Sequence, residues 1–352
     1  MAADTGRIRE KIREVSEGKQ ITIMHLCGTH EDTVSKYNLR SMLPENVRLV
    51  AGPGCPVCII PDTDLQKVFH LIEKRDVVLT TFGDMARVPF QNRSLFYYRS
   101  RGKDVRVVYS VFDAVEIARK TKKDVVFFGI GFETTMPSIA VAVKDSPENF
   151  YVYSAHRYFI PAIEAIIKGK MKIDAFINPG HVSTIVGVKA YERYRKYGIP
   201  MTIAGFEPQD VMLAVYMLVR AVAENRAEVF NEYTRAVKYE GNVMAQKVMD
   251  EVFSAGSGEW RGFGEIPGTG VSLRKEYQDR DAEVAFEDIF SDFQPTEDPR
   301  KRKCRCGEVL KGLINPDECS LYMTACTPRN PVGPCMVSFE GTCAIWAKYG
   351  IR

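Results

Sequence analysis

The chain has 352 residues, of which 45% are hydrophobic and 26% charged, a composition typical of a globular protein. Its 48 Lys and Arg against 45 Asp and Glu give a net charge of +3, which gives no reason to expect a nucleic-acid partner. No apolar run approaches the roughly 20 residues of a membrane span, and the N-terminus lacks the apolar block of a signal peptide. We therefore expect a cytoplasmic protein of two or three domains, with its thiols kept reduced.

The first part of the chain predicts alternating strands and helices. Ile8, Ile12 and Val15 recur at helical spacing, so the chain is expected to open with a helix. Eight short apolar runs follow, without the polar alternation of half-exposed strands, as in parallel sheets buried on both faces. These runs are 21–26, 47–51, 76–81, 105–109, 124–128, 150–153, 175–177 and 201–204. Helical patterns between them, such as 63–74 and 112–121, indicate βαβ units with right-handed crossovers.

Grouping the runs in chain order predicts the domains. The first four would form one sheet and the last four another, although a single larger sheet is the alternative. The expected fold is α/β: two small parallel-sheet, Rossmann-like domains over 1–120 and 121–225, then a mainly helical or irregular cysteine-rich domain over 226–352. This last part begins within a helical stretch broken at Gly241 and continues through a glycine-rich segment, 256–270.

Polar and glycine-rich loops follow most of the predicted strands, at the edge where open parallel sheets bind ligands. Two sheets that turn this edge inward bring these loops to one cleft. Four polar residues there indicate a site with acid–base or hydrogen-bonding groups, although each alone is equally well explained as orienting its loop. They are Glu133, His156, His181 and Glu207.

The segment Cys55-Pro56-Val57-Cys58 is a CxxC motif after a predicted strand. Its spacing brings two sulfurs within reach of a disulfide or of one shared metal ion. In a cytoplasmic protein this pattern favours a redox dithiol. Half of a zinc site and a pair of inert thiols are the alternatives, and the chain has no second CxxC to complete a zinc site.

Cys27 follows the first strand and lies three residues before His30. A position at a helix N-terminus would lower the pKa of its thiol and favour the thiolate, which is both nucleophile and soft-metal ligand. A small buried residue is the alternative. His25 lies inside the strand, and we interpret it as a packed or hydrogen-bonded histidine.

Six of the nine cysteines lie after residue 303. Four of them form the series C-x14-C-x6-C-x16-C: Cys304, Cys319, Cys326 and Cys343. Four thiolates suit a [4Fe–4S] cluster or a structural zinc ion, and the wide spacing differs from the paired ligands of zinc sites, which favours the cluster. Cys306 and Cys335 are left over; a disulfide, a role as alternates to Cys304 and Cys343, and free thiols are the three options.

These motifs resemble those of the HypD family of hydrogenase maturation factors. The matching segments are CGTH at 27–30, GPGCPVC at 52–58, GFETT at 131–135, PGHVS at 179–183, CTPRNPVGPC at 326–335 and SFEGTC at 338–343. The likeness extends from about residue 20 to the end of the chain, and no family cysteine is missing. GPGCPVC and the cysteine spacing are its most specific parts.

The resemblance implies a third domain that carries a [4Fe–4S] cluster, a complex with the small chaperone HypC, and docking of HypE, as a HypE–HypF assembly, which delivers cyanide. Cys27 and a HypC cysteine would hold the iron of a transient Fe(CN)2CO group. The cluster and the Cys55/Cys58 dithiol would supply or relay electrons. His30, Glu133 and His181 complete the predicted catalytic residues, with His30 expected to act on Cys27 without binding iron.

The expected function is therefore a redox-active assembly scaffold rather than a conventional turnover enzyme. One alternative is a stand-alone thiol–disulfide oxidoreductase whose four-cysteine site holds a structural metal. Another is an inert interaction module with a metal-stabilised tail. Colour separates these hypotheses, because thiolate-bound iron–sulfur clusters are brown and zinc sites are colourless.

Overall fold

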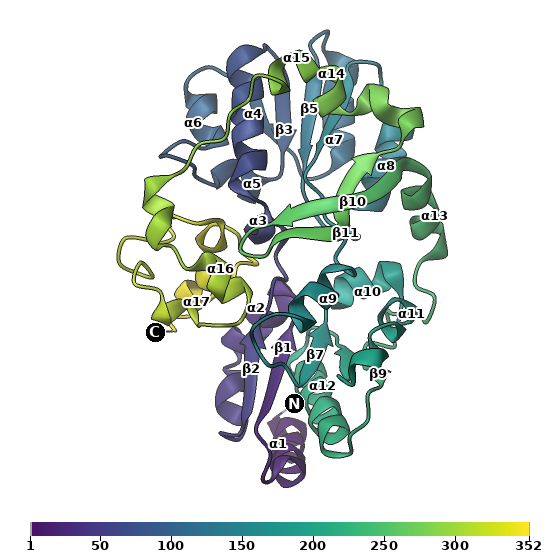
Figure 1. Cartoon of the computed structure of the whole chain (residues 1–352), viewed down its shortest axis with the longest axis vertical. Helices are drawn as coiled ribbons and strands as arrows, with labels where there is room; N and C mark the ends of the chain where they lie inside the picture. The colour runs from purple at the N-terminus through teal and green to yellow at the C-terminus, as the bar shows by residue number, and fades with distance from the viewer. Residues whose placement is uncertain (1, 352) are drawn as a thin grey trace.

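The computed structural model describes residues 2–351, with the side chains of residues 6–351. Two parallel sheets flanked by helices lie at opposite ends of the molecule, and a cysteine-rich C-terminal region packs at the side between them (Figure 1). The predicted α/β class, with parallel sheets and a cysteine-rich C-terminal region, is confirmed.

The larger sheet has the strand order β2-β1-β7-β8-β9, and all its pairs are parallel. Its strands are β1 (Ile21–His25), β2 (Val47–Ala51), β7 (Ala175–Asn178), β8 (Met201–Ile203) and β9 (Val229–Asn231). Each of the first four coincides with a predicted apolar run. The edge strand β9 escaped prediction because its three residues are only half-buried and form no apolar run.

The smaller sheet has the order β4-β3-β5-β6 and is also parallel. Its strands are β3 (Val78–Thr81), β4 (Val105–Val107), β5 (Val125–Gly129) and β6 (Phe150–Ser154). The expected grouping in chain order is wrong, since β1 and β2 pair with strands that come after residue 170. A boundary near residue 120 does not separate the sheets, because the whole of 78–154 is inserted between strands of the larger one.

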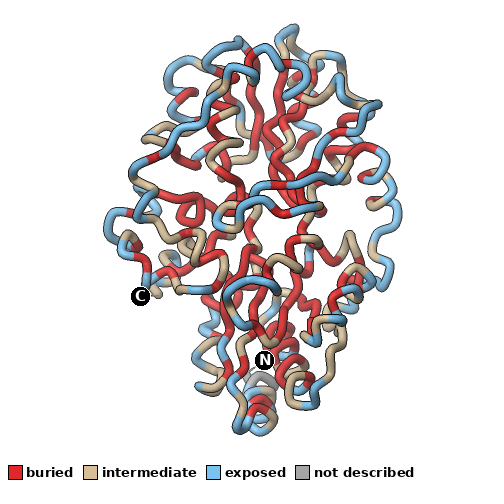
Figure 2. Tube along the Cα trace, viewed as in Figure 1, coloured by how far each residue is buried: buried red, intermediate tan, exposed pale blue. Residues whose placement is uncertain are grey.

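Helices cover both faces of each sheet. On one face of the larger sheet, apolar side chains of α1 (Ala2–Ser16) and α12 (Pro208–Ala223) pack against Ile21, Ile23 and Ile177. On one face of the smaller sheet, α7 (Val111–Lys120), α8 (Met136–Lys144) and α13 (Val243–Val252) pack together. The remaining faces of both sheets belong to one continuous apolar core, so the two halves are held together by burial (Figure 2).

The remaining α-helices lie in the connections between these elements. They are α2 (Gly28–Lys36), α3 (Pro56–Ile59), α4 (Asp62–Lys74), α5 (Gly83–Arg87), α6 (Leu95–Ser100), α9 (Ala162–Ile167), α10 (Gly180–Val186), α11 (Lys189–Glu192), α14 (Ala282–Ala285), α15 (Glu287–Phe290), α16 (Cys306–Leu310) and α17 (Thr342–Lys348). The last two belong to the cysteine-rich region, which is otherwise built of short 3-10 helices and turns.

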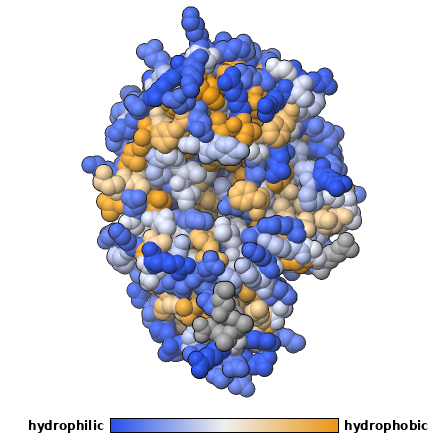
Figure 3. All heavy atoms as spheres, turned by 180° about the vertical axis from the view of Figure 1, so that it is seen from behind, coloured by the Kyte–Doolittle hydropathy of each residue, from blue (hydrophilic) through white to orange (hydrophobic). Residues whose placement is uncertain are grey.

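The glycine-rich segment forms an antiparallel hairpin, β10 (Phe253–Trp260) and β11 (Gly264–Leu273), which crosses the middle of the molecule between the two sheets (Figure 1). Seen from behind, hydrophilic side chains cover both ends of the molecule, and apolar atoms gather over its upper half and waist (Figure 3). Within residues 2–351, no helix has the length and apolarity needed to cross a membrane.

Candidate metallocentre-assembly site

Cys27 lies where β1 ends and α2 begins, and it is the N-cap residue of that helix. Burial, aided by the charge of Glu340, raises the pKa of its thiol to about 12. It outweighs the opposite effect of hydrogen bonds from the backbone of His30 and from the backbone and side chain of Thr29. The predicted helix N-terminus is confirmed, whereas the predicted lowered pKa is wrong. The free thiol is therefore protonated at neutral pH, and a metal ion that binds it displaces the proton.

Two glycines allow other loops to close on Cys27. A Cβ on Gly54 would overlap the backbone of Cys27, and a Cβ on Gly28 would lie 2.5 Å from the Cβ of Glu340. The GPGCPVC loop and the SFEGTC loop therefore both need glycine at the point of contact. They enclose Cys27 from the larger sheet and from the C-terminal region, and leave it only 6% exposed.

Glu340 is the residue that sequence reasoning missed beside Cys27. Burial, followed by the charge of Asp84, raises the pKa of its carboxyl to about 7. A carboxyl group with this pKa exchanges its proton near neutral pH and is therefore suited to acid–base work beside a thiol. The only feature of the sequence that could have identified Glu340 is its place as the acidic residue of the SFEGTC motif.

His30 and His181 both pack against the ring of Phe206. The ring centroids lie 5.0 Å apart for His30 and Phe206 and 4.1 Å apart for His181 and Phe206. His30 donates its Nε2–H to the carbonyl oxygens of Ala204 and Gly205, at 3.2 and 3.0 Å, so its Nδ1 carries a free lone pair. Burial lowers the pKa of His30 to about 3, which keeps the imidazole neutral. No residue from 6 to 351 bonds this buried Nδ1.

A buried carboxylate, Glu31, joins α2 to the C-terminal helix. Its oxygens accept hydrogen bonds from His25, Ser35, Arg40 and Trp346 at 2.6–2.9 Å. Because Trp346 lies in α17, three residues after Cys343, this network ties the Cys27 helix to the cysteine-rich region. The interpretation of His25 as a hydrogen-bonded histidine is confirmed.

The CxxC dithiol occupies the short helix α3. The Sγ atoms of Cys55 and Cys58 lie 2.7 Å apart, and both residues are at least 97% buried. Cys58 also reaches Cys335 of the C-terminal region: burial, then hydrogen bonds to Cys335 and Cys55, raise the pKa of its thiol. The dithiol is thus in sulfur contact with the terminal cysteines and inaccessible to a protein disulfide.

Cys335 is the centre of the terminal sulfur contacts. Hydrogen bonds from Cys306, Cys343 and Cys58 hold the pKa of its thiol well below the usual value. Cys306 in turn contacts Cys304. All nine cysteines, which fall within the described residues, are free thiols, so the structure contains no disulfide between Cys306 and Cys335. A chain of sulfur contacts therefore runs from Cys55 through Cys58 and Cys335 to the terminal group.

Six terminal cysteines line one cavity, together with apolar side chains such as Val309 and Met336. The six are Cys304, Cys306, Cys319, Cys326, Cys335 and Cys343. The six sulfurs surround this cavity and form a soft donor set between apolar walls, which fits a thiolate-bound centre such as an iron–sulfur cluster.

The remaining predicted residues lie elsewhere. Glu133 accepts hydrogen bonds from the backbone of Phe159 and Ile160 through Oε1, and burial raises its pKa to about 7. It lines a separate cavity of about 420 Å³ beside α13, and Cys27 is not among the residues that line this cavity. His156 packs against Gly129, where a Cβ would overlap its ring. Glu207 caps α12 and so orients its loop.

Comparisons with known proteins agree on one family. The family model HypD, described as "Hydrogenase formation hypA family", matches residues 4–350. The chain is 42% identical over 360 residues to the hydrogenase maturation factor HypD of Cupriavidus necator, covering 98% of this chain and 94% of the relative. It is 40% identical over 352 residues to the HypD of Escherichia coli, with 97% and 93% covered. It is also 42% identical over 352 residues to HypD2 of Bradyrhizobium diazoefficiens, with 96% and 91% covered.

Proposed function

The chain belongs to the HypD family of hydrogenase maturation factors, and we propose that it is the cytoplasmic scaffold on which the Fe(CN)2CO group of [NiFe]-hydrogenases is assembled. The position of Cys27 is the observation that carries this proposal. The GPGCPVC and SFEGTC loops meet at this thiol, and an acid with a near-neutral pKa lies beside it. The iron and its diatomic ligands are the cargo, and they leave with the product.

Cys27 binds the iron as a thiolate. Low-spin ferrous iron with cyanide favours soft, electron-rich ligands, which thiolate supplies. The proton that leaves Cys27 passes to Glu340, whose raised pKa makes it a competent acceptor near neutral pH. The hydrogen bonds from Thr29 and from the backbone of His30 then stabilise the sulfur's negative charge.

His30 acts on this centre without binding the iron. Its Nε2–H is already committed to the carbonyl groups of Ala204 and Gly205, which fixes the ring. The free Nδ1 of this neutral imidazole accepts a hydrogen bond from a protonated ligand or water near the iron. His181, which also packs against Phe206, is the more exposed of the two histidines and is the one we assign to the incoming reactant.

Cys304, Cys319, Cys326 and Cys343 would hold a [4Fe–4S] cluster, which would supply electrons one at a time. Cys306 and Cys335 lie between these ligands and the dithiol, and two successive one-electron transfers along this chain of sulfur contacts would reach Cys55 and Cys58. Reduction of a Cys55–Cys58 disulfide takes two electrons and two protons and yields two thiols. Because both sulfurs are buried, a stand-alone role on protein disulfides is disfavoured.

We propose the partners that the resemblance implies. HypC contributes the second cysteine to the iron, and HypE, within a HypE–HypF assembly, delivers cyanide. A maturation assay in a bacterium that lacks its own HypD protein tests the proposal. Cys55→Ser and Cys58→Ser should retain the brown cluster and yet fail to mature hydrogenase. Loss of the cluster in either variant would instead place these residues among its ligands.

A further inference from the structure

The tip of the β10–β11 hairpin contacts the segment that follows the Cys55/Cys58 dithiol and also the terminal cysteine-rich region. The backbone N–H of Arg261 donates to the carbonyl of Ile59, the residue after Cys58, at 2.6 Å. Its guanidinium Nη2 donates to the carbonyl of Ile60 and to Asp62 Oδ1, both at 2.7 Å. One residue therefore fixes the whole segment that follows the dithiol.

The same turn is seated on the cysteine-rich region. Gly262 has φ +82°, and a Cβ there would lie 2.6 Å from the Cα of Gly307. Gly307 follows Cys306 directly, so the hairpin tip touches the terminal cysteine group through a glycine–glycine contact. The side chain of Arg261, only 16% exposed, lies within electrostatic reach of Cys304 and Cys306.

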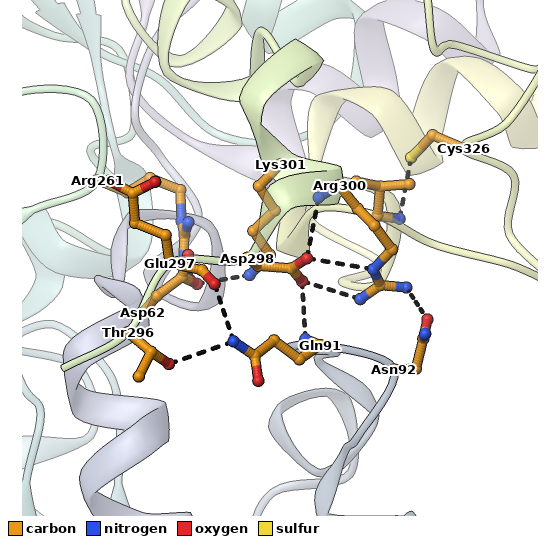
Figure 4. Close-up of polar contacts among 11 residues, drawn as sticks. Asp62, Gln91, Asn92, Arg261, Thr296, Glu297, Asp298, Arg300, Lys301 and Cys326 are labelled. Carbon is orange, nitrogen blue, oxygen red and sulfur yellow. Dashed lines mark hydrogen bonds and ion pairs between the residues drawn. The ribbon is translucent and has the colours of Figure 1, made fainter. Parts of the chain in front are cut away.

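The charged side chains around Arg261 have a net positive charge. Asp62 is shared by Arg261 and by Lys301, whose Nζ lies 2.5 Å from the same oxygen (Figure 4). The neighbouring pair Asp298–Arg300, at 2.9 Å, is balanced within itself. Two cations and one carboxylate therefore leave one positive charge in a largely buried position beside the thiols.

Arg261 also has a donor to spare. Its Nε–H is buried, and no acceptor from residues 6–351 bonds it. A buried unpaired guanidinium N–H costs free energy unless an acceptor is supplied. The adjacent cysteine cavity would supply such an acceptor when its sulfur atoms carry negative charge.

We propose that Arg261 is a positioning residue of the cysteine centre, whose guanidinium supplies the counter-charge and the N–H donor that raise the reduction potential of the group held there. This inference rests on the proposed cluster. Positive charge and hydrogen bonds to sulfur both favour the more negatively charged, reduced state of an iron–sulfur centre. Because Arg261 also bonds the segment after Cys58, the same residue contacts both the dithiol segment and the terminal cysteine centre.

The test is an anaerobic potentiometric measurement on the purified full chain, followed by visible absorption and electron paramagnetic resonance. Arg261→Gln should lower the equilibrium constant for one-electron reduction about tenfold, equivalent to 59 mV. Arg261→Lys, which keeps the charge, should retain more of the wild-type potential. Arg195→Gln, an exposed arginine paired with Glu192, is the matched control and should leave it unchanged.

An Arg261→Gln protein with a full cluster and the wild-type potential would overturn the inference. If that variant does not hold its cluster, Lys301→Gln decides: the inference requires a lowered potential there too, and an unchanged one rejects it. A colourless wild-type protein, reconstituted anaerobically with iron and sulfide, would instead reject the cluster and with it that part of the proposed function.

Discussion

Cys58 and Cys335, from opposite ends of the chain, lie in hydrogen-bond contact through their sulfur atoms. Cys58 belongs to the CxxC helix beside the larger sheet, and Cys335 is the centre of the terminal cysteine contacts. The contact makes the two cysteine groups one connected system. It also gives Cys335, left unassigned by its spacing in the sequence, a definite place between dithiol and terminal cavity.

This contact predicts a specific cross-link. In Cys55→Ser, Cys58 has lost its CxxC partner, so mild oxidation should join it to Cys335. Cys55 is not among the described side chains that bond Cys335, so Cys58→Ser should form no such bond. Peptide mapping by mass spectrometry after alkylation measures both outcomes. Equal cross-linking of Cys55 and Cys58 to Cys335, or none in either variant, would contradict the arrangement.

Glu31 should be a major source of stability, because its carboxylate is buried and bonded by four side chains. Removing one member of a buried ion pair typically costs about 3–5 kcal/mol, since the partner charge is left uncompensated. Glu31→Ala should therefore lower the free energy of unfolding by about this amount in urea denaturation. Glu45→Ala, at an exposed position, is the control and should change it little.

The contribution of Glu31 should also depend on pH. Burial alone would raise the pKa of Glu31, but Arg40 and His25 outweigh it and hold the pKa below its usual range. The ionised carboxylate therefore stabilises the fold above the unfolded pKa of about 4.3, and this stabilisation is lost as the pH falls through the folded value. The difference between wild type and Glu31→Gln should shrink between pH 5 and pH 2. A constant difference would show that the charge plays no part.

Glu133 should behave in the opposite way. Burial raises its pKa to about 7, so the folded protein prefers the protonated form. Its stabilising contribution is complete below about pH 4.3 and is lost as the pH rises through 7, a change of about 4 kcal/mol. Glu133→Gln should remove this slope from the free energy of unfolding measured between pH 5 and 8. The exposed control Glu265→Gln should preserve it, and an unaltered slope in Glu133→Gln would count against a buried neutral carboxyl group.

Local patterns predicted the strands well, because a strand buried on both faces needs a continuous apolar run wherever it lies. The pairing of strands was not predictable in this way. β2 and β3 have similar runs, yet they belong to different sheets, since the path of the connecting chain decides which edge a strand joins. β9 was missed because it is only half-buried and therefore lacks the continuous apolar run that identified the other strands.

The site divides along similar lines. Cys27, Cys55, Cys58 and the terminal cysteines could be found from residue type and spacing, because thiols carry their chemistry wherever they lie. The charge beside Cys27 could not, since Glu340 acts through a contact that only the closed chain makes. Nor does the sequence reveal that burial raises the pKa of Cys27 against the effect of its helix N-terminus. Glu133 does follow a strand, as predicted, but the cavity that it lines is separate from Cys27.

The most direct test of the central claim is anaerobic infrared spectroscopy of the protein co-purified with HypC from cells that contain every accessory factor. Iron-bound cyanide and carbonyl absorb where protein does not. The account predicts these bands in the wild-type complex and their loss in Cys27→Ala, whose terminal cluster should remain intact. Bands that persist in Cys27→Ala would place the iron elsewhere, and a brown wild-type complex without bands would contradict the assembly role.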